Sequence, residues 1–269
     1  MGETLRQESR EARRLLEALE PPLEPERVME AVPELGLARG VGQGDFHHLD
    51  TLGHILQTIR EIEGELEDGR LSASAPEERR DGLRLVGLLH DIAKPVTRGE
   101  LEGRVLFVAH DTLGARQAWL ICRRLGVSSE LTDMAATPTA LHLKIGFMSN
   151  PRSDYPPERL VAAVGPFAAE LAVLSWADRL AARGARLKPE HIERHRVLCE
   201  EFLSHSRARP LPSLPDYETL AGELNSKNAS EAGYAAFHLR LLAARGVPED
   251  EARAQVFGML SGRCPEGEG

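Results

Sequence analysis

The stretch LVGLLHDIAKP, residues 85–95, is the most informative part of the chain. Its apolar residues predict the last turns of a buried helix, and Pro95 marks where that helix has stopped. The pair His90-Asp91 lies at the helix end, where an unpaired carboxylate would be costly to bury. A bound metal ion would supply the missing partner, because imidazole and carboxylate groups are both metal ligands. A single His-Asp pair is weak evidence, and the chain has a second one, His110-Asp111.

The rest of the sequence is typical of an all-α protein. Leu, Ala, Arg and Glu dominate the 269 residues, and alternating β-branched runs are scarce. We expect a helical bundle at 45–205, preceded by short helices at 1–44 and followed by a linker and a helical tail at 206–269. A short hairpin or turn over Thr97–Phe107 is the one expected departure from helix.

Apolar periodicity and Pro or Gly breaks predict the individual helices. In chain order they cover Glu3–Leu19, Glu26–Leu35, Leu49–Leu66, Glu78–Ile92, Thr112–Leu125, Ser129–Ile145, Pro157–Val164, Pro166–Arg183, Pro189–Ser204, Tyr217–Leu224, Ser230–Ala244 and Glu249–Leu260. The segment Ser206–Pro215 contains three prolines and is predicted to be a linker.

Charge and composition exclude several classes of protein. The net charge of −9 argues against a surface that binds nucleic acid broadly. It leaves room for a small basic patch at the entrance of a binding site. Three widely spaced cysteines, without a CxxC motif, argue against a disulfide scaffold or a cysteine zinc site. The most apolar run, Leu160–Ala177, contains Glu170 and is broken at Gly165-Pro166, so we expect buried helices there and no membrane contact. A cytoplasmic location fits these features.

Four further polar residues lie in apolar helical surroundings, namely His54, His110, His142 and Asp178. Taken singly, each has an ordinary explanation, such as a histidine hydrogen-bonded in a core or an aspartate paired with a buried arginine. Asp50 lies four residues before His54, and this spacing predicts that its carboxylate accepts a hydrogen bond from the His54 ring.

Together with His90-Asp91, these residues follow the order of a known metal-binding pattern. The set comprises His54, His90, Asp91, His110, His142 and Asp178. It resembles the HD superfamily of metal-dependent phosphohydrolases, in particular the subgroup with six ligands and two metals. The strings LLHDIAKP, FVAHDTLGA and ADRLAARG are similar to the HD domains of bacterial tRNA nucleotidyltransferases and poly(A) polymerases. They also resemble those of RNA end-healing proteins in which the HD domain is fused to a kinase. The resemblance covers roughly Phe46 to Arg183.

The resemblance implies a role for each residue. Asp91 would bridge two divalent ions, and Mn, Fe, Ni, Co or Zn would suit the ligands, with Mg also acceptable. The remaining ligands would be His54, His90 and Asp178 for the first ion, and His110 and His142 for the second. Lys94 would neutralise charge on the phosphoryl group. Arg183 is a second candidate for that role, and Arg179 is an alternative to it. Lys144, two residues past His142, would point to the opposite side of its helix and is expected at the surface.

The sequence also departs from both groups of relatives. It has no GxxxxGK[ST] loop, and the residues before Phe46 are too few for a transferase head, so we expect neither kinase activity nor nucleotide addition. The expected activity is hydrolysis of a phosphate ester on nucleotides or RNA ends, with 2′,3′-cyclic, 2′- and 3′-phosphates fitting best. Two alternatives stay open: a non-catalytic RNA- or tRNA-binding module derived from a transferase tail, and a hydrolase of alarmones or deoxynucleotides. The sequence predicts no oligomeric state.

Overall fold

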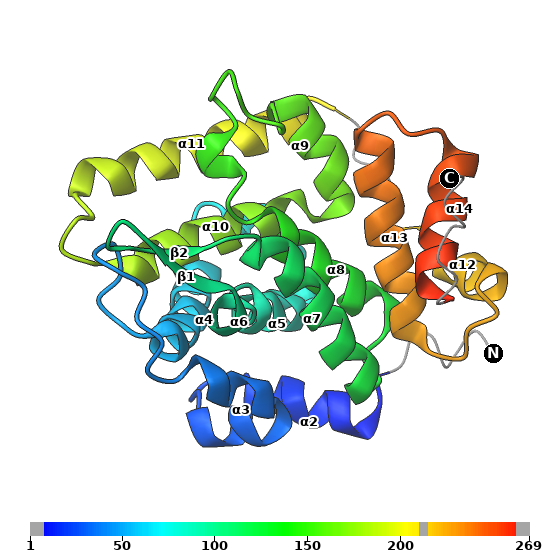
Figure 1. The fold of residues 1–269 in the computed structure, drawn as a ribbon, viewed down its shortest axis with the longest axis horizontal. Helices are drawn as coiled ribbons and strands as arrows, with labels where there is room; N and C mark the ends of the chain where they lie inside the picture. Colours follow the sequence, from blue (N-terminus) through cyan, green and yellow to red (C-terminus); the bar gives the residue numbers. More distant parts are fainter. Residues whose placement is uncertain (1–7, 210–214, 262–269) are drawn as a thin grey trace.

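The fold is seen in a computed structural model that describes residues 8–209 and 215–261. These residues form a bundle of α-helices with one short hairpin, which confirms the all-α class (Figure 1). The beginning of the first predicted helix, at 1–7, and half of the predicted proline linker, at 210–214, lie outside the described residues.

The observed elements follow the predicted ones closely. The α-helices are α2 (Arg10–Ala18), α3 (Pro25–Ala31), α4 (Thr51–Asp68), α5 (Arg80–Leu89), α6 (Lys94–Thr97), α7 (His110–Leu125), α8 (Ser129–Leu141), α9 (Pro157–Val164), α10 (Ala168–Ala182), α11 (Pro189–Arg207), α12 (Tyr217–Glu223), α13 (Ala229–Ala244) and α14 (Glu249–Leu260). Short 3-10 helices cover Pro33–Ala38, Ser72–Ser74, Glu77–Arg79, Ile145–Phe147 and Gly165–Phe167. The antiparallel strands β1 (Arg98–Leu101) and β2 (Arg104–Phe107) confirm the predicted hairpin.

Helix α5 lies at the centre of the bundle, and its second half, from Leu85 to Leu89, is apolar and buried on all sides. It packs on α4, α8 and α10. Leu83 and Val86 belong to a hydrophobic cluster shared with α8 to α11, whereas Leu85 and Leu88 belong to a second cluster shared with the N-terminal helices. A helix that is hydrophobic all round has to be buried. The two clusters therefore fix the position of α5 and of the residues that follow it.

The predicted helix to Ile92 ends earlier, at Leu89, and the reason is local. The amide of Ile92 donates to the carbonyl of Leu89 at 3.2 Å, and the amide of Lys94 donates to the carbonyl of Asp91 at 3.0 Å. Both are hydrogen bonds from residue i+3 to residue i, which tighten the chain at a helix end. This tight turn places His90 and Asp91 side by side, directly after the buried helix.

The most apolar run forms interior helices, as predicted. Residues Pro157–Ala182 are long and apolar enough for a membrane span, and an 18-residue window within them has a mean hydropathy of 1.7. However, 78% of that window is buried inside the protein. The run is broken into α9 and α10 at Gly165-Pro166. Glu170 is fully buried and accepts a hydrogen bond from Arg79 at 3.0 Å, so its charge is paired within the core.

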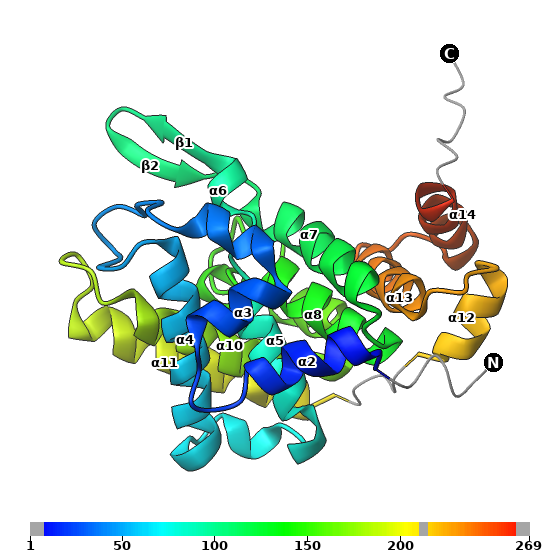
Figure 2. The same ribbon diagram turned by 90° about the horizontal axis from the view of Figure 1, so that it is seen from below.

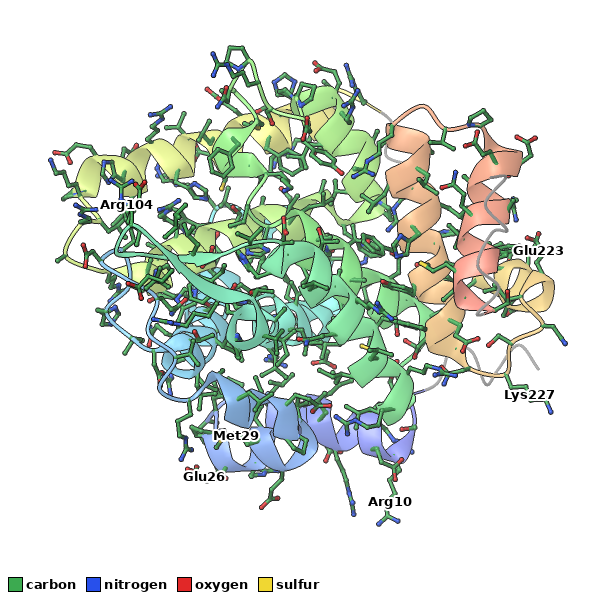
Figure 3. The ribbon with its side chains drawn as sticks, viewed as in Figure 1. Arg10, Glu26, Met29, Arg104, Glu223 and Lys227 are labelled. Atoms are coloured by element: carbon green, nitrogen blue, oxygen red, sulfur yellow. The ribbon has the colours of Figure 1, made fainter. Side chains whose placement is uncertain are left out.

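The C-terminal helices pack at the end of the molecule away from the hairpin (Figure 2). Figure 3 shows this separation through Arg104 in the hairpin and Glu223 in α12, at opposite ends of the view. Helix α13 lies against α7, α8 and α9. Its Arg240 binds both carboxylate oxygens of Asp133 in α8, and the Tyr217 hydroxyl donates to the same carboxylate at 3.0 Å. A buried ion pair thus joins the tail to the bundle.

We expect Asp133→Ala to lower the free energy of unfolding by about 3–5 kcal/mol, because it leaves the Arg240 guanidinium buried without its counter-charge. Asp133 is fully buried, and the Arg240 side chain is 13% exposed. Glu223→Ala is the matched control, since it breaks the more exposed pair with Arg253 and should cost about 0–1 kcal/mol. Urea unfolding measures both values. Equal losses in the two variants would contradict the assignment.

A second prediction concerns His238 of α13. Burial, aided by the nearby Arg245, lowers the pKa of His238 from 6.5 to about 4. As the pH falls, the His238 imidazole therefore binds a proton near pH 6.5 in the unfolded chain, but only near pH 4 in the folded chain. Stability should be complete above pH 6.5 and fall as the pH drops towards 4. In His238→Gln that fall should be smaller by about 1–3 kcal/mol. The exposed His205→Gln is the control, and an identical pH profile in all three proteins would refute the prediction.

Candidate metal centre

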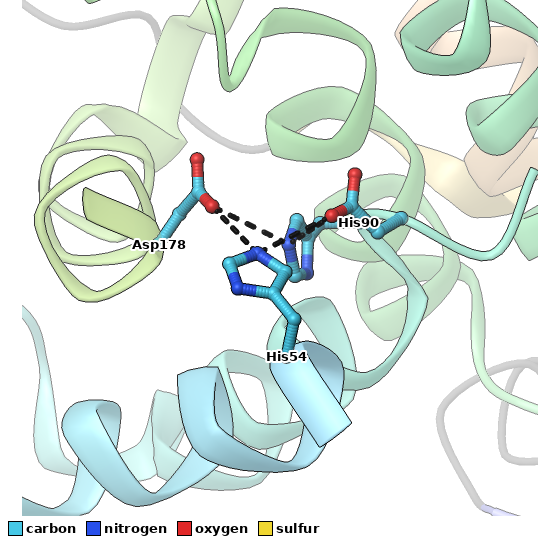
Figure 4. A group of neighbouring side chains, drawn as sticks. His54, His90 and Asp178 are labelled. Atoms are coloured by element: carbon cyan, nitrogen blue, oxygen red, sulfur yellow. Dashed lines mark hydrogen bonds and ion pairs between the residues drawn. The ribbon is translucent and has the colours of Figure 1, made fainter. Parts of the chain in front are cut away.

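Six polar side chains from five parts of the chain converge beside the end of α5. They are His54 from α4, His90 and Asp91 from the turn after α5, His110 from the start of α7, His142 from the end of α8, and Asp178 from α10. Figure 4 shows His54, His90 and Asp178 pointing toward one another from separate segments. His54, His90 and Asp91 are fully buried, and the Asp178 side chain is 22% exposed.

Asp91 lies at the centre, and its two carboxylate oxygens face different histidines. Its Oδ2 lies 3.2 Å from His90 Nε2 and 3.4 Å from His54 Nε2. Its Oδ1 lies 3.4 Å from His110 Nε2 and 3.8 Å from His142 Nε2. The six side chains therefore form two groups that share Asp91, each compact enough to hold a metal ion.

Asp178 completes the first group from the opposite side. Its Oδ1 lies 2.9 Å from His54 Nε2 and 3.9 Å from His90 Nε2. This group therefore offers two imidazoles and two carboxylates, and the second group offers two imidazoles and the other oxygen of Asp91.

Three of the histidines are oriented in the same way, by a carbonyl three residues earlier. Nδ1 of each ring donates to that carbonyl, from His90 to Gly87 at 2.8 Å, from His110 to Phe107 at 2.7 Å and from His142 to Thr139 at 2.7 Å. A carbonyl only accepts, so Nδ1 carries the proton and the neutral ring presents the lone pair of Nε2. In each case Nε2 faces Asp91, which is the tautomer that a metal requires.

The unsatisfied atoms at the centre fit a divalent cation. Nε2 of His90 and of His110 and both carboxylate oxygens of Asp91 are buried and have no hydrogen-bond partner among residues 8–209 and 215–261. Buried polar atoms normally have such a partner, so several atoms of this kind converging on one point are suited to bind a cation. Nitrogen and oxygen donors of this kind suit first-row transition metals.

The electrostatics keep both carboxylates charged. Burial alone would raise the pKa of Asp91, but the neighbouring His90 and Lys94 outweigh burial and hold that pKa well below its ordinary value. Hydrogen bonding and charge from His54 likewise outweigh burial at Asp178 and hold its pKa well below the ordinary range. For His142, burial prevails and lowers the pKa to about 4. Anionic carboxylates and an uncharged imidazole are the forms that bind metals.

Lys94 reaches the same centre, and a residue that the sequence analysis missed holds it there. Its Nζ forms an ion pair with Asp91 Oδ2 at 2.5 Å and donates a hydrogen bond to Gln43 Oε1 at 2.6 Å. The Gln43 amide is fixed in turn by the carbonyls of Leu49 and Asp50. Gln43 lies 51 residues before Lys94 in a glycine-rich loop, so nothing in the local sequence pattern marked it.

Two sequence-based interpretations need correction. The Asp50 carboxylate accepts hydrogen bonds from the amides of Gly53 and Gly40, at 2.7 and 2.6 Å, so it caps α4 and does not serve the His54 ring. Lys144, expected at the surface on the far side of its helix, instead donates to Asp111 Oδ2 at 2.9 Å. The helix has already ended at Leu141, so the helical spacing from His142 does not apply to it.

Arg183 is placed differently from Lys94. Its guanidinium donates to Glu61 at 2.7 Å and its side chain is 57% exposed. The segment around it is joined to residues 45–48, through Gly184 N to Phe46 O at 2.9 Å and His48 N to Ala182 O at 3.1 Å. Gly184 is required by this contact, because a Cβ there would lie 2.2 Å from the Phe46 carbonyl carbon.

Comparisons with known proteins agree with this geometry. The profile of the HD domain matches residues 46–183. The chain is 30% identical over 232 residues to an A-adding tRNA nucleotidyltransferase of Deinococcus radiodurans. The aligned region covers 84% of this chain and 50% of that protein. It is 29% identical over 248 residues to a CC-adding tRNA nucleotidyltransferase of Thermus thermophilus, covering 88% and 51% respectively. The chain thus spans about half the length of these relatives. With its helical bundle and its His/Asp cluster, the chain belongs to the HD domain family.

Proposed function

We propose that the chain is a divalent-metal-dependent phosphohydrolase that acts on nucleotides or RNA ends. The observation that carries this proposal is the Asp91 carboxylate, whose two oxygens each face a separate pair of imidazoles. A cluster that divides in this way is suited to two metal ions. In two-metal sites the ions clamp the attacking and leaving oxygens of a phosphate ester.

In this proposal the six clustered residues hold the ions, which would be Mn, Fe, Ni, Co, Zn or Mg. The bound ions would polarise a water molecule and neutralise the phosphate oxygens. Lys94 would bind the phosphoryl group directly. An ammonium has three donors, and the hydrogen bond to Gln43 and the ion pair with Asp91 engage at most two of them, so at least one remains for a phosphate oxygen.

Arg183 stays a predicted second phosphate ligand, but it would first have to leave Glu61. Because its guanidinium is largely exposed and already paired, the proposal assigns the main electrostatic role to Lys94. Arg179, the alternative, lies directly after Asp178 and has a buried Nε without a hydrogen-bond partner.

The substrate class follows from the relatives and from the cluster together. Both relatives are tRNA nucleotidyltransferases by name, which favours an RNA end as substrate, with 2′,3′-cyclic, 2′- and 3′-phosphates as the best candidates. A purely RNA-binding module is the second reading, but such a module has no chemical need for orphaned metal-ligand atoms. Hydrolysis of alarmones or deoxynucleotides is a third. A cytoplasmic location remains a prediction.

The ligand assignment predicts how metal content changes in variants. We expect two divalent ions per wild-type chain, about one in His110→Ala, and none in Asp91→Ala, because only Asp91 serves both groups. Metal analysis after loading with Mn²⁺ and dialysis measures this. His205→Ala, at an exposed position, is the control and should keep both ions. An Asp91→Ala protein with full metal content would contradict the assignment.

Hydrolysis tests the proposed activity. The metal-loaded protein should hydrolyse members of a panel containing a chromogenic phosphate ester, 2′,3′-cyclic AMP, 2′-AMP, 3′-AMP and signalling dinucleotides. We expect Lys94→Ala to lower kcat/KM by about 100-fold with unchanged metal content, because it removes a positioned charge from the reacting phosphate. Arg183→Ala should lose less than about tenfold if its guanidinium stays on Glu61. A metal-loaded protein that hydrolyses nothing in the panel would favour the binding-module reading.

A further inference from the structure

A cavity of about 590 Å³ lies beside the metal centre, between the end of α10, one face of α11 and two loops. Its volume is in the range of small-molecule sites, about 300–1,000 Å³. Helix α11 contributes His191, Arg194, His195 and Leu198, which are spaced so that they share one face of that helix. The opposite wall consists of Phe46 and of residues from the 146–150 loop, including Phe147.

The cavity is cationic, which is unusual in this acidic chain. Two arginines and two histidines line it, and none of its lining residues within the described ranges carries a carboxylate. Three other cavities are each lined by at least two acidic residues. Arg179 and Arg194 have no carboxylate within ion-pair distance among residues 8–209 and 215–261, and Arg179 Nε is buried without a hydrogen-bond partner. The two guanidinium groups are therefore available to an anion.

Two aromatic rings stand at the same cavity. Phe46 is 46% exposed and Phe147 is 57% exposed, although large apolar side chains usually gain stability by burial. Exposed aromatic rings next to unpaired arginines are the combination that binds single-stranded nucleic acid, where bases stack on the rings and phosphates meet the cations.

Residues that line the cavity are connected to three of the six proposed ligands, by chain adjacency, by a ring contact or by hydrogen bonds. Arg179 directly follows Asp178 in α10. Phe46 precedes His47, whose ring packs edge-on against the His54 ring with 4.8 Å between centroids. His195 in the wall bonds to the Ser175 hydroxyl at 3.0 Å, and this hydroxyl also donates to the carbonyl of His142 at 3.2 Å. A group bound in the cavity would therefore be a near neighbour of a phosphate bound at Asp91.

We infer that this cavity binds the penultimate nucleotide of an RNA end, the one before the nucleoside that carries the reacting phosphate. Its base would lie against Phe46 and Phe147, and the phosphodiester that joins it to the terminal nucleoside would lie on Arg179 and Arg194. This inference rests on the proposed function for the identity of the reacting group. It deepens that proposal, since it makes the preferred substrate an oligonucleotide end and makes a mononucleotide a poor substitute.

The first test compares substrates of two lengths. Wild-type kcat/KM should be at least about tenfold higher for the dinucleotide ApA with a 3′-phosphate than for 3′-AMP. Phe147→Ala and Arg194→Ala should each remove most of that advantage and leave 3′-AMP hydrolysis unchanged. Phe147→Trp should keep it, because the stacking surface remains. Arg14→Ala, which removes an arginine from a cavity near the N-terminus, is the matched control. Equal rates on both substrates in the wild type would overturn the inference.

The second test does not depend on hydrolysis. Binding of the dinucleoside phosphate ApA, which has no terminal phosphate, is measured by calorimetry at several salt concentrations. Phe147→Ala should weaken binding about tenfold, and Arg194→Ala should reduce the slope of log Kd against log salt by about one. If the wild type hydrolyses nothing but these changes are seen, the cavity stands as an RNA site and only the proposed activity fails. Binding that is the same in the wild type, both cavity variants and Arg14→Ala would overturn the inference.

Discussion

The position of one carboxylate determines the organisation of this molecule. Asp91 is fully buried, and burial opposes its charge, so the surrounding histidines and Lys94 must compensate for it. His90 and Lys94 are close to Asp91 in sequence, but His54, His110 and His142 come from other helices, and the bundle has to bring them together. The two hydrophobic clusters on either side of α5 do so by fixing the helix end from which Asp91 projects. The packing of the hydrophobic core thus determines where the buried carboxylate and its partners lie.

Much of this arrangement could be predicted from the sequence, because helices are encoded by local patterns. The bounds of α9 and α14 and the six clustered residues were all within reach of periodicity and motif order. What local patterns do not encode is contact between loops. Gln43 meets Lys94 across 51 residues, and Asp50 turned out to cap its own helix because nearby amides compete for its carboxylate. The cavity walls were missed for the same reason, since Phe46 and Phe147 become neighbours of α11 only in the folded chain.

Positive charge gathers at one place in this molecule, although the net charge of the chain is negative. The chain carries a net charge of −9, yet Lys94 lies at the cluster, and Arg179 and Arg194 in the adjoining cavity have no paired carboxylate in the part of the chain that the structure describes. Such a surface would repel a polyanion over most of its area and attract it at one place. That pattern suits recognition of a chain end better than binding along a duplex, where many phosphates would need cations.

The repeated contact between each histidine and the carbonyl three residues before it has a consequence for how such a centre can change over time. His90, His110 and His142 each bring their own orienting group within a four-residue unit. Each unit orients its own ring, and the three rings converge on Asp91. A descendant could therefore lose the unit at His110 or His142 and keep the other half intact. One-metal and two-metal versions of this centre are then separated by single substitutions, with no need to rebuild the fold.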